Sequence, residues 1–122
     1  MEDLSKYKDD FILFLETGFI AINQADEDAA LKLFKACELL EPGHSLIKLG
    51  IGYLHLHKLE IKQACQLFDE VLKNEPNNEM ALTFKGIALS LSPEEGMKGE
   101  QLLEKTLKGS SDPEIKKVCN TT

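Results

Sequence analysis

Two stretches of the chain decide its fold: GFIAINQADEDAALKLFKACELLEP (Gly18–Pro42) and GYLHLHKLEIKQACQLFDEVLKNEP (Gly52–Pro76). The sequence number rises by 34 from Gly18 to Gly52, and by 34 again to a third glycine, Gly86. A period of about 34 residues is typical of a repeated helix-turn-helix unit, so the sequence predicts an all-α solenoid. The residues that return at this period are Gly18 and Gly52, Ala30 and Ala64, Phe34 and Phe68, and Pro42 and Pro76.

Each returning residue has a physical role in a pair of packed helices. A glycine inside a helix costs about 1 kcal/mol relative to alanine, so its recurrence indicates that two helices cross closely there, with the alanine of the second helix at the crossing. The phenylalanine fills the space between one unit and the next. Proline cannot continue a helix, so we predict that the second helix of each unit ends at Glu41–Gly43 and at Glu75–Asn78. The apolar spacing i, i+3, i+4, i+7 agrees with a helix at Ala30, Leu33, Phe34, Cys37 and Leu40.

The third unit departs from this pattern. The sequence numbers of Gly86 and Gly99 differ by 13, whereas those of Gly18 and Ala30 differ by 12, which indicates one inserted residue. We predict that Ser92 caps the following helix, with Pro93 at the first helical position and Glu95 completing a capping box.

The two ends of the chain extend the array. We predict that residues Leu4–Asp10 extend the first helix, and the carboxylates of Asp26–Asp28 suit the positive end of the second helix. After Gly109 we predict a short C-terminal helix at 113–119, in which Ile115 and Val118 cover the end of the solenoid.

Composition narrows the class of protein. The chain has 122 residues, which suits a single domain (1–122), and its 43% hydrophobic content is that of a globular protein. The net charge of −7 argues against binding nucleic acid or anionic membranes. The start Met1–Leu4 lacks the basic residues of a signal peptide, and the apolar stretch Phe11–Ile22 is too short to span a bilayer and is interrupted by Glu16. Three cysteines without metal spacing fit reduced thiols, so we expect a cytoplasmic protein.

The repeated markers resemble those of the tetratricopeptide (TPR) family, in which a large apolar residue and Leu-Gly precede alanine, an aromatic residue, a small residue and proline. The resemblance covers residues 11–109. It implies three TPR units at about 11–44, 45–78 and 79–111, arranged in a right-handed superhelix with a short C-terminal capping helix at 113–119.

The resemblance also implies a binding groove lined by the first helix of each unit. One TPR class binds a C-terminal carboxylate there, but the corresponding positions Leu15, Phe19, Gly50, Met80 and Phe84 cannot pair with a carboxylate, which excludes that activity. An apolar groove suits the apolar face of an amphipathic helix. The alternative is that some of these residues belong to the core, or are covered by the ends of the chain or by a second copy. The implied groove residues are Ile12, Leu15, Phe19, Ile22, Leu46, Leu49, Tyr53, Leu56, Met80, Thr83, Ile87 and Leu91.

Size, repeat count and groove polarity are similar to those of the small TPR chaperones of bacterial type III secretion, especially the class that partners the needle subunit. This resemblance implies that the groove holds an amphipathic helix of that subunit, keeping it soluble and unpolymerised, with a small co-chaperone as a further partner. The alternative function is a generic TPR scaffold that acts through self-association as a homodimer or binds another helical protein.

The sequence offers little for catalysis or cofactor binding. His55 and His57 are at i and i+2 on a predicted helix and do not share a face, so they make a poor metal pair. Cys37 and Cys65 occupy packing positions, Cys119 lies near the C-terminus, and no third group completes a Cys/His pair. We therefore expect no enzyme activity, no metal and no cofactor.

Overall fold

The protein is all-α over residues 4–109, which are the residues that the structure, a computed structural model, describes, with side chains from residue 7 onward. This part of the chain contains no strand, which confirms the all-α part of the predicted fold class, and Leu4–Asp10 does extend the first helix. The predicted capping helix 113–119, with Ile115, Val118 and Cys119, lies outside the described residues. The helices are α1 (Leu4–Asn23), α2 (Glu27–Leu40), α3 (Ser45–His57), α4 (Ile61–Asn74), α5 (Glu79–Ser90) and α6 (Gly96–Gly109).

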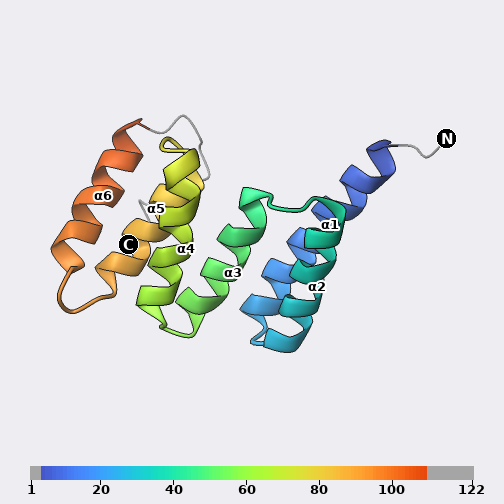
Figure 1. Cartoon of the computed structure of the whole chain (residues 1–122). Coiled ribbons are helices and arrows are strands. Elements are labelled where there is room, and N and C mark those ends of the chain that lie inside the picture. The colour runs from blue at the N-terminus through green and yellow to red at the C-terminus, as the bar shows by residue number, and fades with distance from the viewer. Residues whose placement is uncertain (1–3, 110–122) are drawn as a thin grey trace.

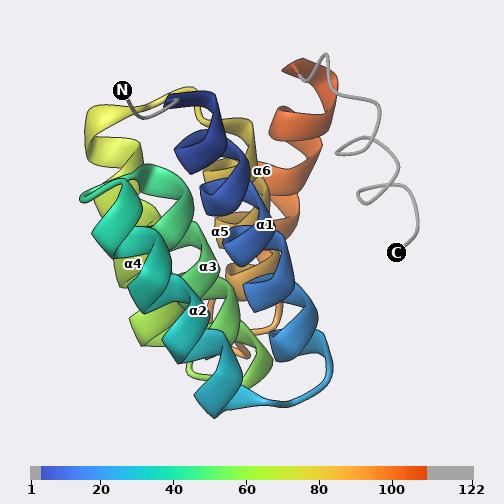
Figure 2. The same cartoon turned by 90° about the vertical axis from the view of Figure 1, so that its right-hand side faces the viewer.

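The helices pack as three consecutive pairs, α1 with α2, α3 with α4 and α5 with α6. Figure 1 shows the pairs following one another in a row, with α1 and α2 at one end and α6 at the other. Helix α3 lies against α1 and α2, and α5 lies against α3 and α4. Figure 2 looks along this row from the α1–α2 end. The first helices of the three pairs are therefore neighbours, although they are distant in sequence.

The rings of the recurring phenylalanines pack directly against the recurring glycines. A Cβ built on Gly18 would lie 2.7 Å from Cε1 of Phe34, and one on Gly50 would lie 2.6 Å from the same atom. Phe34 is thus held between the first helix of its own pair and the first helix of the next pair, as predicted for the space between units. Gly52 and Phe68 repeat this relationship in the second pair.

The third pair packs differently because a glycine replaces the alanine of its second helix. A Cβ on Gly99 would overlap the backbone nitrogen of Ser90 and lie 2.7 Å from the carbonyl oxygen of Gly86. The backbones of α5 and α6 are therefore in direct contact, and the ring that separates the helices in the other pairs is replaced by Leu103 beside Gly86.

The turns inside the first two pairs are alike and depend on one left-handed residue. Ala25 has φ 60° and Leu59 has φ 59°, and the two positions are one period of the repeat apart. The next position in this series is Pro93, whose ring fixes φ at about −65° and forbids the left-handed conformation. The third turn cannot follow the same path, and it is longer.

The predicted N-terminal cap of α6 is wrong. Helix α6 begins at Gly96, and Ser92, Pro93 and Glu95 lie in the turn before it. The carbonyl oxygen of Glu95 accepts a hydrogen bond from the Gly99 amide at 3.0 Å, so Glu95 flanks the helix instead of completing a capping box at its third position. The other predicted turns, after Leu40 and after Asn74, are confirmed.

Candidate functional site

A cluster of aromatic side chains joins α1, α3 and α5. Tyr53 of α3 stacks on Phe84 of α5, with ring centroids 5.3 Å apart, and packs against Phe19 of α1 at 5.2 Å. His57, one turn further along α3, meets the edge of Tyr53 at 4.5 Å. We call Phe19, Tyr53, His57 and Phe84 the aromatic cluster. Its rings come from all three helix pairs, so the stacking of the pairs creates it.

Tyr53 links the aromatic cluster to a polar group at the end of α1. Its hydroxyl donates a hydrogen bond to Oδ1 of Asn23 at 2.9 Å. Partial burial raises the pKa of the Tyr53 hydroxyl above its ordinary value, so the group stays protonated and remains a donor near neutral pH. An apolar ring with an oriented hydroxyl at its rim suits a partner that is apolar on one side and polar on the other.

The structure separates the predicted groove residues into two groups. Ile12, Met80 and Leu91 are exposed and Phe19, Leu46, Tyr53 and Ile87 are partly buried, so these seven can meet a partner. The other five are core residues that a partner cannot reach in this conformation. Those five are Leu15, Ile22, Leu49, Leu56 and Thr83.

The division has a simple cause in the packing of neighbouring helices. Leu49 is fully buried because it joins the cluster around Phe68, Ala81 and Ala88. Its counterpart in α1, Leu15, is buried in the same way. The family pattern places both positions on the groove side of the helix, but here the adjacent helices cover them.

Phe84, which the sequence analysis considered only as a carboxylate-binding position, was left out of the predicted groove residues. It stacks on Tyr53 and lies 5.7 Å from Phe68, which connects the aromatic cluster to the core. Phe84 and Ile87 stand at i and i+3 on the same helix, so helical spacing places both on one side of α5. Because Ile87 was already a predicted groove residue, this spacing could have indicated that Phe84 lies on the same surface.

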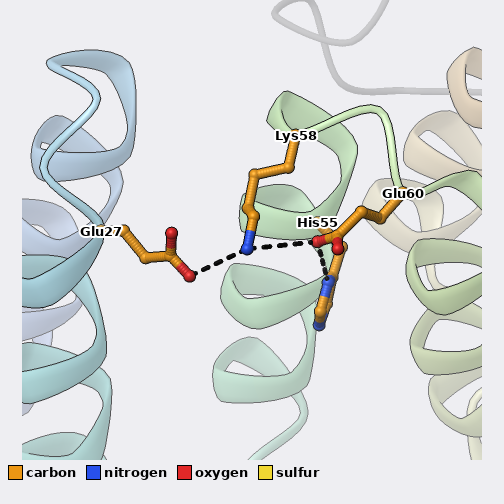
Figure 3. A network of polar contacts seen from close by, with 4 residues as sticks. All are labelled: Glu27, His55, Lys58 and Glu60. Carbon is orange, nitrogen blue, oxygen red and sulfur yellow. Dashed lines mark hydrogen bonds and ion pairs between the residues drawn. The ribbon is translucent and has the colours of Figure 1, made fainter.

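A polar network of Glu27, His55, Lys58 and Glu60 holds the second pair against the first (Figure 3). Nζ of Lys58 lies 3.0 Å from Oε1 of Glu27 on α2 and 3.4 Å from Oε1 of Glu60. Nδ1 of His55 lies 2.9 Å from the same Glu60 oxygen. The network fastens the α3–α4 turn to the start of α2, and the cation also suits the negative end of α3.

The ionic states of the network follow from these contacts. The hydrogen bond to Glu27 is the main reason that the pKa of Lys58 is raised, and Glu60 adds to it. The hydrogen bond with His55, and then that with Lys58, lowers the pKa of Glu60. Both side chains therefore keep their charges near neutral pH, although exposed pairs of this kind contribute little stability each.

The thiols in the described residues are unsuited to nucleophilic chemistry. Cys37 is buried and lies with Sγ 3.7 Å from the carbonyl oxygen of Phe11, and burial raises its pKa. Cys65 is partly buried, and burial followed by the charge of Asp69 raises its pKa as well. Over residues 4–109, no group of three His, Cys, Asp or Glu side chains is placed to hold a metal ion. No helix within that range is long and apolar enough to cross a membrane.

Comparisons of the chain with protein-family models, with curated proteins and with solved structures found no match.

Proposed function

We propose that the chain is a TPR protein that binds the apolar face of an amphipathic helix with the surface formed by α1, α3 and α5. The observation that carries this proposal is the aromatic cluster, which spans all three pairs and is bordered by exposed or partly buried apolar residues. Aromatic rings give large contact areas at a low entropic cost, and they are common energetic centres of protein interfaces. The internal repeat of Gly18–Phe34 and Gly52–Phe68 supports the TPR assignment.

Within this proposal, the partner is a subunit of a type III secretion system, most simply the needle subunit, and the protein acts as its cytoplasmic chaperone. A subunit that polymerises through an amphipathic helix is kept soluble when that apolar face is buried. Burial of about 25 cal/mol per Å² over a surface of standard size, roughly 1,600 Å², gives a large gross driving force before association costs are subtracted. The net charge of −7 keeps such a complex soluble.

The partner-facing residues are fewer than the twelve that the family pattern implies. They are the seven groove residues that the structure leaves accessible, together with the partly buried Phe84. Among them, the exposed Ile12 stands about two turns before Phe19 on α1, and the exposed Met80 about one turn before Phe84 on α5. Substitutions at Leu49 or Leu15 would disrupt the core and would not report on binding.

The test is co-expression with the needle subunit of the same organism, followed by measurement of complex mass and of the subunit's polymerisation by light scattering. We expect a stable complex that suppresses polymerisation, and we expect Tyr53→Asp and the more exposed Met80→Asp to lose both effects. The matched control is Leu39→Asp, an exposed leucine on α2 away from the cluster, which should retain them. Variants are compared only after far-UV circular dichroism shows native helix content. The proposal would be refuted if the complex survived both Tyr53→Asp and Met80→Asp, or if the wild-type chain formed no complex.

A further inference from the structure

Helix α1 exposes two large apolar side chains, whereas the residues at the corresponding repeat positions of α3 and α5 are buried. Leu13 is 57% exposed and Ile20 is 53% exposed. The residues one period later, Ile47 and Leu54 on α3, are 3% and 5% exposed. The next pair in the series, Ala81 and Ala88 on α5, is fully buried. The face of α1 that carries Leu13 and Ile20 is therefore a stacking face with no preceding helix pair, and we call it the head face.

The surface that covers Ile47 and Leu54 inside the molecule can be identified. Both belong to one hydrophobic cluster with residues of the preceding α1–α2 pair. The members of that pair in the cluster include Phe11, Phe14, Leu33, Cys37 and Leu40.

The counterparts of these covering residues line a hollow at the other end of the row. A hollow of about 320 Å³ lies between α5 and α6, lined in part by Leu82, Leu102 and Thr106. Leu82 is the counterpart of Phe14, two full periods later in the sequence. Leu102 is the counterpart of Leu33 once the residue inserted before α6 is allowed for. We call this hollow the tail hollow. One end of the molecule thus exposes the face that the interior joints bury, and the other end carries a hollow at the position of the surface that buries it.

The threonine hydroxyls on both surfaces already have hydrogen-bond partners, and the other polar side chains that line the tail hollow are those of Asn77, Glu79 and Lys105. Thr17 lies between Leu13 and Ile20, and its hydroxyl donates to the carbonyl oxygen of Leu13 at 2.7 Å. In the tail hollow, the hydroxyl of Thr106 donates to the carbonyl oxygen of Leu102 at 2.8 Å. Because each hydroxyl is satisfied within its own helix, excluding water from these surfaces leaves no unpaired hydroxyl.

We propose that the chain self-associates head to tail, with the head face of one copy seated in the tail hollow of a second copy, in place of the helix 113–119 that the sequence analysis expected to cover this end. The contact continues the internal stacking of the helix pairs into the next molecule, and it leaves the aromatic cluster free. It is heterologous, since different surfaces meet, so it adds copies in a line and does not close into a twofold dimer. Each copy carries a net charge of −7, so association strengthens as salt screens the repulsion.

An ion pair inside the molecule suggests a substitution that should strengthen the association between copies. Lys85 on α5 pairs with Asp69 on α4 at 2.6 Å, across the joint between the second and third pairs. The counterpart of Lys85 on α1 is Thr17, and the counterpart of Asp69 on α6 is Glu104. Thr17→Lys should therefore meet Glu104 of the neighbouring copy and tighten the association. Adding Glu104→Lys to Thr17→Lys should reverse the gain, because two cations then face each other.

The decisive experiment uses two half-blocked full-length chains in sedimentation velocity. Ile20→Glu blocks the head face, and Leu102→Glu blocks the tail hollow. Each variant alone should stay monomeric, with self-association at least about tenfold weaker than that of the wild type. A mixture of the two should form a complex of one copy of each, since one open head and one open tail remain. Lys105→Glu, at an exposed position on the hollow, serves as a second tail variant if Leu102→Glu loses its helix content.

The control for added charge is Leu39→Glu, which should self-associate as the wild type does. A wild-type chain that stays monomeric across a concentration series overturns the proposal, and this is the result expected if residues 110–122 or another protein occupy the tail hollow. Self-association that survives Ile20→Glu overturns it too, as does a mixture of the half-blocked chains that stays monomeric. None of these results alters the binding test for the aromatic cluster, because that test uses different substitutions and a different partner.

Discussion

The backbone of Gly52 lies directly against the ring of Phe68, and a Cβ on Gly52 would come 2.5 Å from Cε1 of that ring. The ring is fully buried, so it has no space into which it can move. The same relationship between Gly18 and Phe34 makes this contact the repeated element of the fold.

Gly52→Ala is therefore expected to destabilise the protein. Overpacking a rigid core costs about 1–3 kcal/mol, which exceeds the helix-propensity gain of roughly 1 kcal/mol from replacing glycine with alanine. Chemical denaturation measures the change. Gly109→Ala is the matched control, because a Cβ there meets nothing within 4 Å. A Gly52→Ala variant as stable as the control would show that the Phe68 ring moves to accommodate the added Cβ.

Thr83→Val is expected to stabilise the protein. The hydroxyl of Thr83 is buried and makes no hydrogen bond in the described part of the chain, and an unpaired buried hydroxyl costs about 1–3 kcal/mol. Thr106 is the control, since it is also buried but donates to Leu102. Urea denaturation should show Thr83→Val gaining roughly 1 kcal/mol while Thr106→Val gains nothing. Equal losses in the two variants would mean that Thr83 has a partner in solution.

Leu59→Gly is expected to stabilise the turn between α3 and α4. Leu59 is exposed and has φ 59°, a conformation that costs an L-residue about 1–2 kcal/mol and costs glycine little. Leu31→Gly, an exposed leucine inside α2, should instead lose about 1 kcal/mol of helix propensity. Thermal unfolding of the two variants should shift the melting temperature in opposite directions. A fall in both would indicate that the Leu59 side chain contributes more than its backbone strain costs.

The Glu60 network should contribute to stability in a pH-dependent way. The pKa of Glu60 is lowered in the folded state from a reference of 4.5. Its contribution is therefore present above the unfolded pKa and is lost as the pH falls through the folded pKa. Glu60→Gln should lower the melting temperature near neutral pH and flatten its dependence below about pH 4.5. Glu70→Gln, whose nearest cation lies 3.8 Å away, is the control. Parallel acid curves for the wild type and Glu60→Gln would contradict this role.

The sequence predicted the elements whose causes are local. Pro42 and Pro76 mark the turns after α2 and α4 because a proline ring excludes a helical hydrogen bond wherever it occurs. The turn at Pro93 was predicted wrongly, because α6 begins only at Gly96 although Ser92 and Pro93 carry the local signals of a helix start. The left-handed conformation at Ala25 and Leu59 was not predicted either. Nothing in an alanine or a leucine indicates that conformation.

The candidate site was predictable only in part. Helical spacing assigns Leu49 and Tyr53 to one side of α3, but it does not say that α5 covers the first and leaves the second partly open. Leu13 and Ile47 occupy the same position of the repeat and are chemically alike. They differ in exposure because one has a preceding helix pair and the other does not.

By itself, the sequence determined the all-helical class, the period of the repeat and the turns that contain Pro42 and Pro76. Helix propensity, apolar spacing and the geometry of the proline ring all act within a few residues of the chain. The tertiary structure alone decided which apolar residues become core, which rings meet in the aromatic cluster and which faces stay open at the two ends. Burial depends on neighbours contributed by other helices, and those neighbours are set only when the pairs stack.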